Sequence, residues 1–404
     1  MTRAAAVFVL LCVARLASAQ AAAPPSAEGD GRAQYPAVLA NSFASMSVGY
    51  INYPFSDLQL EPGHRVESIQ VPHVAARAVL FGHHFGKYVS AQASYMRPVK
   101  YVKYLNVDGA AGTQTAWMHF GTVTLLGRVP LNERLALYAE SGIAVNNRSG
   151  FEIGDRSIVR DLHFTSPLFG GGIEYRVGSA VDVTAGTTYI PKRDEGRQPY
   201  TLFTAAGLRY NMRRLTAAQV ADTVSAGFIF PKHVVQAGYT TDAVGFGVNQ
   251  FVSKTVPIFW GGHVRVKRSV LTLTYQRNLF HTKKIFGFDI GGSFGRWTSQ
   301  ANGETFQTLS IYPLARFTLI RSRPADVYFG YAVAGPSYIS REMIDGLDMG
   351  GHFTFQDFMA LGMFAGAARH FNVELNLNHY SNGNILHDNA GVRIPLSFKL
   401  GYAF

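Results

Sequence analysis

The sequence predicts an all-β fold made of transmembrane antiparallel β-barrels, with two tandem eight-stranded barrels as the preferred arrangement. Apolar and polar residues alternate through both halves of the chain, as in strands that place one face on lipid and the other on a barrel lumen. The chain has 41 Gly, 20 Tyr and 29 Phe, yet no run approaches the ~18 apolar residues of a membrane helix. An alternating segment also ends the chain at an aromatic residue, Phe404, as is typical of outer-membrane barrels.

The N-terminus predicts secretion. "MTRAAAVFVLLCVARLASAQ" has a positive Arg3, an apolar stretch and a small-x-small site, so residues 1–19 read as a signal peptide. The single cysteine, Cys12, lies within it, and the mature chain is therefore expected to form no disulfide. Residues 20–40 are rich in Ala, Pro and Gly and are expected to form a flexible leader. A signal peptide followed by barrel strands predicts an integral protein of the outer membrane of a Gram-negative-type bacterium.

The formal net charge of +11 favours a partner with an anionic surface, for which lipid phosphates are one candidate and nucleic acid is not. Scattered, solvated Lys and Arg side chains account for the same charge equally well. The sequence contains no phosphate-binding loop.

The alternating segments assign faces to their residues. "VLTLTYQR" sets Leu271, Leu273 and Tyr275 against polar neighbours, and "VRIPLSFKLGYAF" places its apolar set, from Val392 to Phe404, opposite Arg393, Ser397 and Lys399. Because the backbone in lipid must satisfy its own hydrogen bonds, such strands have to close into barrels. The polar set is expected to face the lumen, where charged side chains pair and fill a narrow barrel without an open pore; these are Glu140, Glu174, Arg176, Asp182, Asp289 and Arg316.

The strand pattern divides the chain into two units. About eight strand-like segments lie in 41–212 and eight or nine in 223–404, while 213–222 is a polar, helix-compatible linker. "TLFTAAGLRYNM" closes the first set much as "PLSFKLGYAF" closes the second. One barrel of sixteen strands is the alternative. In its spacing and closing strand, the first half resembles the small outer-membrane barrels of the OmpA/OmpX kind, which implies no catalytic residues there.

The segment "FNVELNLNHYSNGN", residues 371–384, carries the candidate chemistry. Its apolar residues share one face with His379 and Ser381, while its asparagines and Glu374 occupy the other. Bacterial barrels keep their termini in the periplasm, so this strand climbs about 25 Å to the outer rim and presents both residues to the outer leaflet. A histidine within reach of a serine activates it for acyl transfer as a general base. Such a dyad needs no metal and no cofactor.

Two segments resemble a known family. "LNHYSNGNILHDNAGV" (377–392) and "GGHFTFQDFMALGMFAG" (350–366) are similar to the lipid A 3-O-deacylases of the PagL type, eight-stranded barrels with a Ser/His site on the lipid-facing exterior. The resemblance implies that Ser381 is the nucleophile and His379 the base. It also implies that Asn382 and Asn389 belong to the site. Asn389 and a backbone N–H near Asn384 would then stabilise the oxyanion.

The sequence departs from this family at one position. Where the family carries a glutamate that orients the histidine, this chain has Arg393, and a cation cannot accept the imidazole N–H. Asp388, in the loop, is a candidate replacement if it folds back over His379. Arg393 is alternatively a ligand for a lipid phosphate.

These features predict an outer-membrane ester hydrolase that removes an acyl chain from lipid A or a related outer-leaflet lipid. The alternative is a non-catalytic structural or lipid-binding barrel that has lost the orienting acid. The pattern leaves open the acyl position, the role of the first barrel and the oligomeric state.

Overall fold

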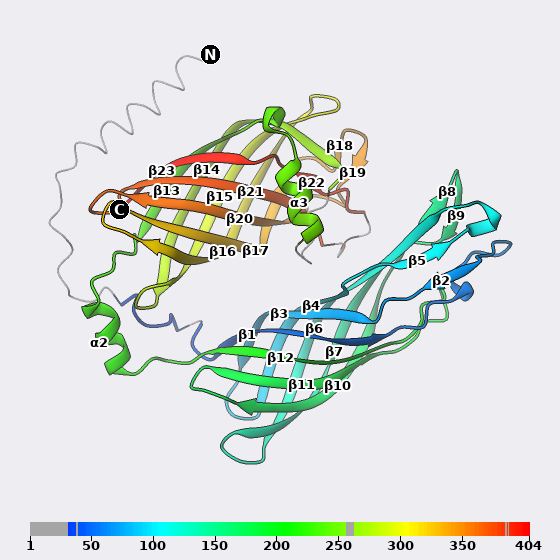
Figure 1. The fold of residues 1–404 in the computed structure, drawn as a ribbon, viewed down its shortest axis with the longest axis horizontal. Helices are drawn as coiled ribbons and strands as arrows, with labels where there is room; N and C mark the ends of the chain where they lie inside the picture. The colour runs from blue at the N-terminus through cyan, green and yellow to red at the C-terminus, as the bar shows by residue number, and fades with distance from the viewer. Residues whose placement is uncertain (1–30, 38, 256–261, 384–385, 387) are drawn as a thin grey trace.

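Two closed antiparallel β-barrels of eight strands each make up most of the described part of the chain (Figure 1). The structure, a computed structural model, describes residues 31–37, 39–255, 262–383, 386 and 388–404. The predicted pair of barrels is confirmed, because each set of eight strands closes on itself by hydrogen bonds, which excludes one ring of sixteen. The predicted signal peptide and most of the leader lie outside the described residues.

The first barrel is closed by pairing of its first and last strands, from Ser42 opposite Met212 to Asn52 opposite Leu202. Its eight strands are β1 (Ser42–Asn52), β3 (Val74–His84), β4 (Val89–Pro98), β6 (Thr113–Pro130), β7 (Leu135–Ser149), β10 (Leu162–Arg176), β11 (Val181–Ile190) and β12 (Thr201–Met212). Short elements occupy its long connections: η1 (Asp57–Gln59), β2 (Ser68–Gln70), β5 (Val102–Leu105), η2 (Val107–Gly109), β8 (Phe151–Ile153) and β9 (Arg156–Val159).

The second barrel closes in the same way, with Val234 opposite Ala403. Its eight strands are β13 (His233–Thr240), β14 (Val264–His281), β15 (Phe286–Ser299), β16 (Thr305–Arg321), β17 (Ala325–Ile339), β20 (Phe353–Ala365), β21 (Phe371–Ser381) and β23 (Ser397–Ala403). Its further elements are η3 (Asp242–Val244), α3 (Gly247–Thr255), β18 (Met343–Ile344), β19 (Leu347–Asp348) and β22 (Val392–Arg393). The helix α2 (Ala217–Ser225) lies between the two barrels in the chain.

The helices of the described part of the chain are all too short or too polar to cross a membrane.

The faces of the strands follow the alternation of the sequence. In β14, Leu271, Leu273 and Tyr275 are 40%, 41% and 44% exposed, whereas Thr272 and Thr274 between them are buried. The exposed apolar residues form the outer wall, which lipid covers in a membrane, and the polar residues face the lumen. The hydrophobic period of two therefore specifies both the strand and the side of the barrel that each residue occupies.

The predicted orientation of one residue near the end of the chain, Arg393, is wrong. We expected Arg393 to face the lumen together with Ser397 and Lys399, but Arg393 lies directly opposite the outward-facing His379. The phase changes between β22 and β23, where Pro395 lacks the N–H that a ladder needs. At this level β13 has already ended, and β22 pairs directly with β14 in parallel.

The lumens are filled by charged networks. In the first barrel Arg77 binds Glu140 at 2.5 Å, and Glu174 accepts from Arg128 at 2.7 Å and from Arg209. In the second barrel the pairs are Arg316–Asp289 at 2.8 Å, Lys399–Glu374 at 3.2 Å and Arg321–Asp326 at 2.7 Å. Removing one member of such a buried pair typically costs 3–5 kcal/mol, roughly.

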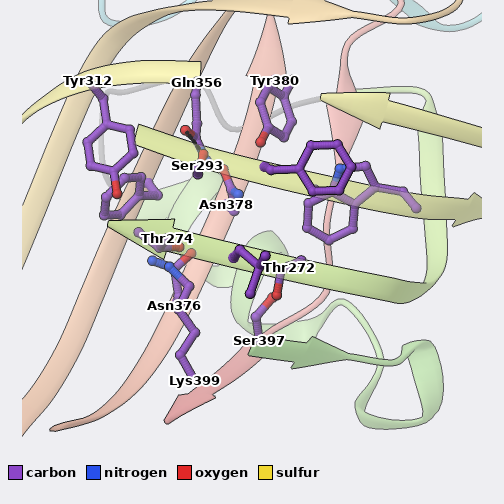
Figure 2. A pocket seen from close by; sticks show the side chains of 15 residues that line it. Thr272, Thr274, Ser293, Tyr312, Gln356, Asn376, Asn378, Tyr380, Ser397 and Lys399 are labelled. Atoms are coloured by element: carbon purple, nitrogen blue, oxygen red, sulfur yellow. Dashed lines mark hydrogen bonds between the residues drawn. The ribbon is translucent and has the colours of Figure 1, made fainter. Parts of the chain in front are cut away.

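A small cavity inside the second barrel shows how little free space remains. Its volume is about 20 Å³, enough for roughly one water molecule. Figure 2 shows Thr272, Asn376, Asn378 and Tyr380 among the side chains that line it. An acyl chain does not fit in this cavity.

Candidate functional site

The candidate site lies at the end of β21, on the outer wall of the second barrel. At the start of this strand the outward-facing side chains are exposed, Phe371 by 66% and Leu375 by 42%. Towards its end they are covered: Leu377 is 4% and His379 3% exposed, and Ser381 is half-buried. The i, i+2 spacing places His379 and Ser381 on the same side of one strand, as the sequence predicts.

His379 is held by the backbone of β22. Its Nδ1 lies 3.1 Å from the carbonyl oxygen of Val392. A carbonyl can only accept, so Nδ1–H donates, and in the neutral ring the lone pair is then on Nε2. The Val392 carbonyl therefore orients the ring. Val392 directly precedes Arg393, the position at which the resembled family carries its orienting glutamate.

Opposite charges flank His379 on its two neighbouring strands. In the antiparallel pairing, Asp357 of β20 lies directly opposite it on one side and Arg393 of β22 on the other. Directly opposite residues have Cβ atoms about 4.5–5.5 Å apart and project on the same face. Arg393 therefore acts electrostatically on the imidazole, and Asp357 is the residue paired with His379 on the other neighbouring strand.

Asp357 is the site residue that the sequence reasoning missed. Its Oδ1 accepts a hydrogen bond of 2.6 Å from the backbone N–H of Ala334. Ala334 has φ +54° and sits where the register of β17 shifts between Ala332 and Gly335. The signal was available in "FTFQDFMALG", where Asp357 shares its parity with Phe355 and the other outward residues.

The loop after β21 is fastened through Asn382. Its backbone N–H donates to Oδ1 of Asn389 at 3.0 Å. Its side-chain Nδ2 donates to the carbonyls of Met349 at 3.1 Å and Asp388 at 2.5 Å. Asn382 and Asn389, both expected at the site, are thus brought together, and their hydrogen bonds set the shape of the loop.

A close backbone approach stabilises the same loop. Gly350 has φ +77°, and a Cβ built there would lie 2.0 Å from the carbonyl oxygen of Asp388 and 2.6 Å from Nδ2 of Asn382. Only glycine fits at such a position. The loop of the site therefore packs directly on the turn that precedes β20.

Two further residues, Asn384 and Asp388, were predicted at the site. Asn384 lies outside the described residues. Asp388 is exposed, and its backbone carbonyl is what contacts Asn382. The acid directly opposite His379 is Asp357.

Helix α3 covers the wall beside the site. Nδ2 of Asn249 donates to the carbonyl of Ile394 at 2.8 Å, and Asn249 is almost fully buried. Val252 packs against the apolar cluster that contains Leu377. This helix therefore covers the wall at Leu377, whereas Phe371 and Leu375 lower on the same strand are exposed.

Among the described residues, no three or more His, Cys, Asp or Glu side chains gather closely enough to hold a metal ion.

The architecture defines the class of protein: two closed barrels with apolar outer walls and charged lumens form an integral outer-membrane protein. Comparison with protein families refines this for each half. Residues 269–397 match the family lipid A 3-O-deacylase (PagL), and residues 72–198 match the OmpA-like transmembrane domain. The resemblance predicted for the two halves is confirmed.

Solved structures similar to the chain are outer-membrane barrels. They include the Neisserial surface protein A, with 15% identity over 42% of this chain and 97% of that one, at a TM-score of 0.29. The N-terminal barrel domain of Pseudomonas aeruginosa OprF has 13% identity over 43% and 98%, at a TM-score of 0.28. The outer-membrane enzyme PagL has 16% identity over 43% and 98%, also at 0.28. No curated protein matches the chain.

Proposed function

We propose that the second barrel is an ester hydrolase that removes an acyl chain from lipid A or a similar acylated lipid of the outer leaflet. The observation that carries this proposal is the placement of Ser381 and His379 on the same side of β21, on the outer wall, with Nδ1 of His379 bonded to the Val392 carbonyl. The match of 269–397 to the lipid A 3-O-deacylase family supports it.

The reaction would proceed by acyl transfer. Oγ of Ser381 attacks the ester carbonyl carbon while Nε2 of His379 takes the hydroxyl proton. The tetrahedral intermediate collapses, the lipid alkoxide leaves with that proton, and the acyl group stays on Ser381. Water, deprotonated by the same nitrogen, then attacks the acyl-serine and releases a fatty acid.

Stabilisation of the oxyanion falls to the loop after β21. An oxyanion-hole donor typically contributes about 3 kcal/mol to the transition state. The Asn389 side chain is the proposed donor, because its Oδ1 is engaged by the N–H of Asn382, which fixes the orientation of the amide. A backbone N–H near Asn384 is the proposed second donor.

The charges beside His379 determine how good a base it is. The imidazolium that forms during attack is stabilised by Asp357 and destabilised by Arg393. At an effective dielectric constant of 20, a unit charge ~6 Å away contributes roughly 3 kcal/mol. The two effects oppose each other, and Val392 contributes only a neutral acceptor where the family has a carboxylate.

The proposed substrate class follows from the position of the site on the outer wall of the barrel. The outer wall below the site is apolar, with Phe371, Leu375 and Leu361 at 66%, 42% and 51% exposed. Acyl chains of an outer-leaflet lipid would lie along such a wall, with an ester near Ser381. The acyl position that is cut is taken from the family resemblance.

The second candidate function is binding of lipid without hydrolysis. The position of Arg393 directly opposite His379 favours it, because a guanidinium there disfavours the imidazolium and is suited to a lipid phosphate.

A serine-directed fluorophosphonate separates the two candidates. We expect the protein in outer-membrane vesicles to be labelled at Ser381, because activation by His379 makes that hydroxyl nucleophilic. Mass spectrometry of the peptide 370–393 locates the label. The matched control is the variant Ser397→Ala, because Ser397 is buried and faces the lumen. Absence of label at Ser381 in the folded protein would favour the binding role.

A further inference from the structure

The first barrel contacts the loop of the candidate site through His119 of β6. Nε2 of His119 lies 3.0 Å from the carbonyl oxygen of Gly383, 264 residues further along the chain. Gly383 follows Asn382 directly and has φ +64°. The contact therefore joins the first barrel to the segment that carries the proposed oxyanion donors.

The burial of His119 shows that this face of the first barrel is covered. His119 has the outward parity of β6, in step with Val123 and Leu125, which are 59% and 61% exposed. His119 itself is only 2% exposed. The outer wall of this strand is thus open lower down and covered where it meets the second barrel.

The imidazole is oriented for this one bond. Trp117 stacks on it at 5.2 Å between ring centroids and 19° between planes, and Tyr95 lies 5.4 Å away. Within the described residues, its Nδ1 is buried without a hydrogen-bond partner. The ring is therefore the neutral Nε2–H tautomer, and its one N–H donates to the carbonyl oxygen of Gly383.

We propose that the first barrel is a brace of the active site, and that His119 is a positioning residue for Gly383 and, through the neighbouring Asn382, for Asn389. This inference rests on the proposed function and adds the role of the first half of the chain. The covered end of the outer wall of β6, at His119, is then an interaction surface whose partner is the second barrel of the same chain. This contact fixes the position of Gly383 and, through the hydrogen bond between Asn382 and Asn389, the position of the proposed oxyanion donor Asn389.

The contact is tested directly by photo-cross-linking in the full-length protein in outer membranes. With p-benzoylphenylalanine at position 119, illumination should join the tryptic peptide 104–128 to 370–393. The same amino acid at position 123 lies in the same peptide but on the exposed wall, and should give no such product. A missing 104–128/370–393 product from position 119 would overturn the brace, whether or not the protein hydrolyses lipid.

The positioning role is tested by turnover of a short-chain ester. His119→Ala should lower kcat about tenfold or more with little change in KM, because small displacements of a reacting group are costly. His119→Gln, which keeps a donor, should recover most of the rate, and Val123→Ala should match the wild type. Heat-modified gel migration confirms that each variant is folded. Full kcat in folded His119→Ala would overturn the positioning role, and a wild type without hydrolysis would instead reject the proposed function.

Discussion

Replacing His379 by alanine is expected to lower the rate of ester hydrolysis by about 10³-fold or more, since removal of the base of a serine dyad leaves the hydroxyl unactivated. The side chain is held by the Val392 carbonyl and shares its face with Ser381, so no neighbouring group takes over its position. Release of fatty acid from purified lipid A by the protein in detergent micelles measures the effect.

His370→Ala is the matched control for this variant. His370 stands just before the same strand, and its Nδ1 makes an analogous bond of 2.6 Å to the carbonyl of Ala403. It lies at the opposite end of β21, so its loss should leave the rate within about twofold of the wild type. Equal rates in His379→Ala and the wild type would show that any hydrolysis occurs elsewhere on the protein.

Replacing Arg393 by glutamate is expected to raise the rate about tenfold to a hundredfold. The substitution removes a cation directly opposite His379 and adds the anion that the resembled family carries there. Each unit charge contributes about 3 kcal/mol at ~6 Å and an effective dielectric constant of 20, part of which is screened at the half-buried rim. The measurement is kcat/KM on the same lipid A substrate.

Two further substitutions test the electrostatic reason. Asp357→Asn should change the rate in the opposite direction, because it removes the anion on the other side of His379. Arg265→Glu reverses the charge of the residue paired with Arg393 on β14, one strand further from His379. A gain from Arg265→Glu as large as that from Arg393→Glu would attribute the effect to general surface charge.

The barrels could be predicted from the sequence because their determinants are local. A period of two over ten residues specifies a strand and both of its faces, as in β14 with Leu273 outward and Thr274 inward. The same pattern placed His379 and Ser381 on the outer wall. Two sets of about eight strand-like segments, each with its own closing segment, predicted the two barrels.

The surroundings of His379 could not be predicted in the same way, because they depend on pairing between strands. Which residue lies opposite His379 is set by the register of β20 and β22, and this register brought in Asp357 and the Val392 carbonyl. The phase change at Pro395 turned Arg393 outward, against the simple alternation. The covering of His119 arises from a contact between barrels, which periodicity along one strand does not encode.

The most direct test of the central claim is mass spectrometry of lipid A from cells that express the wild type or Ser381→Ala. If Ser381 is the nucleophile of a lipid A hydrolase, the wild type should yield lipid A that lacks one acyl chain, and Ser381→Ala should leave lipid A intact at equal amounts of folded protein. Identical lipid A in both strains, whether intact or deacylated, would contradict the account.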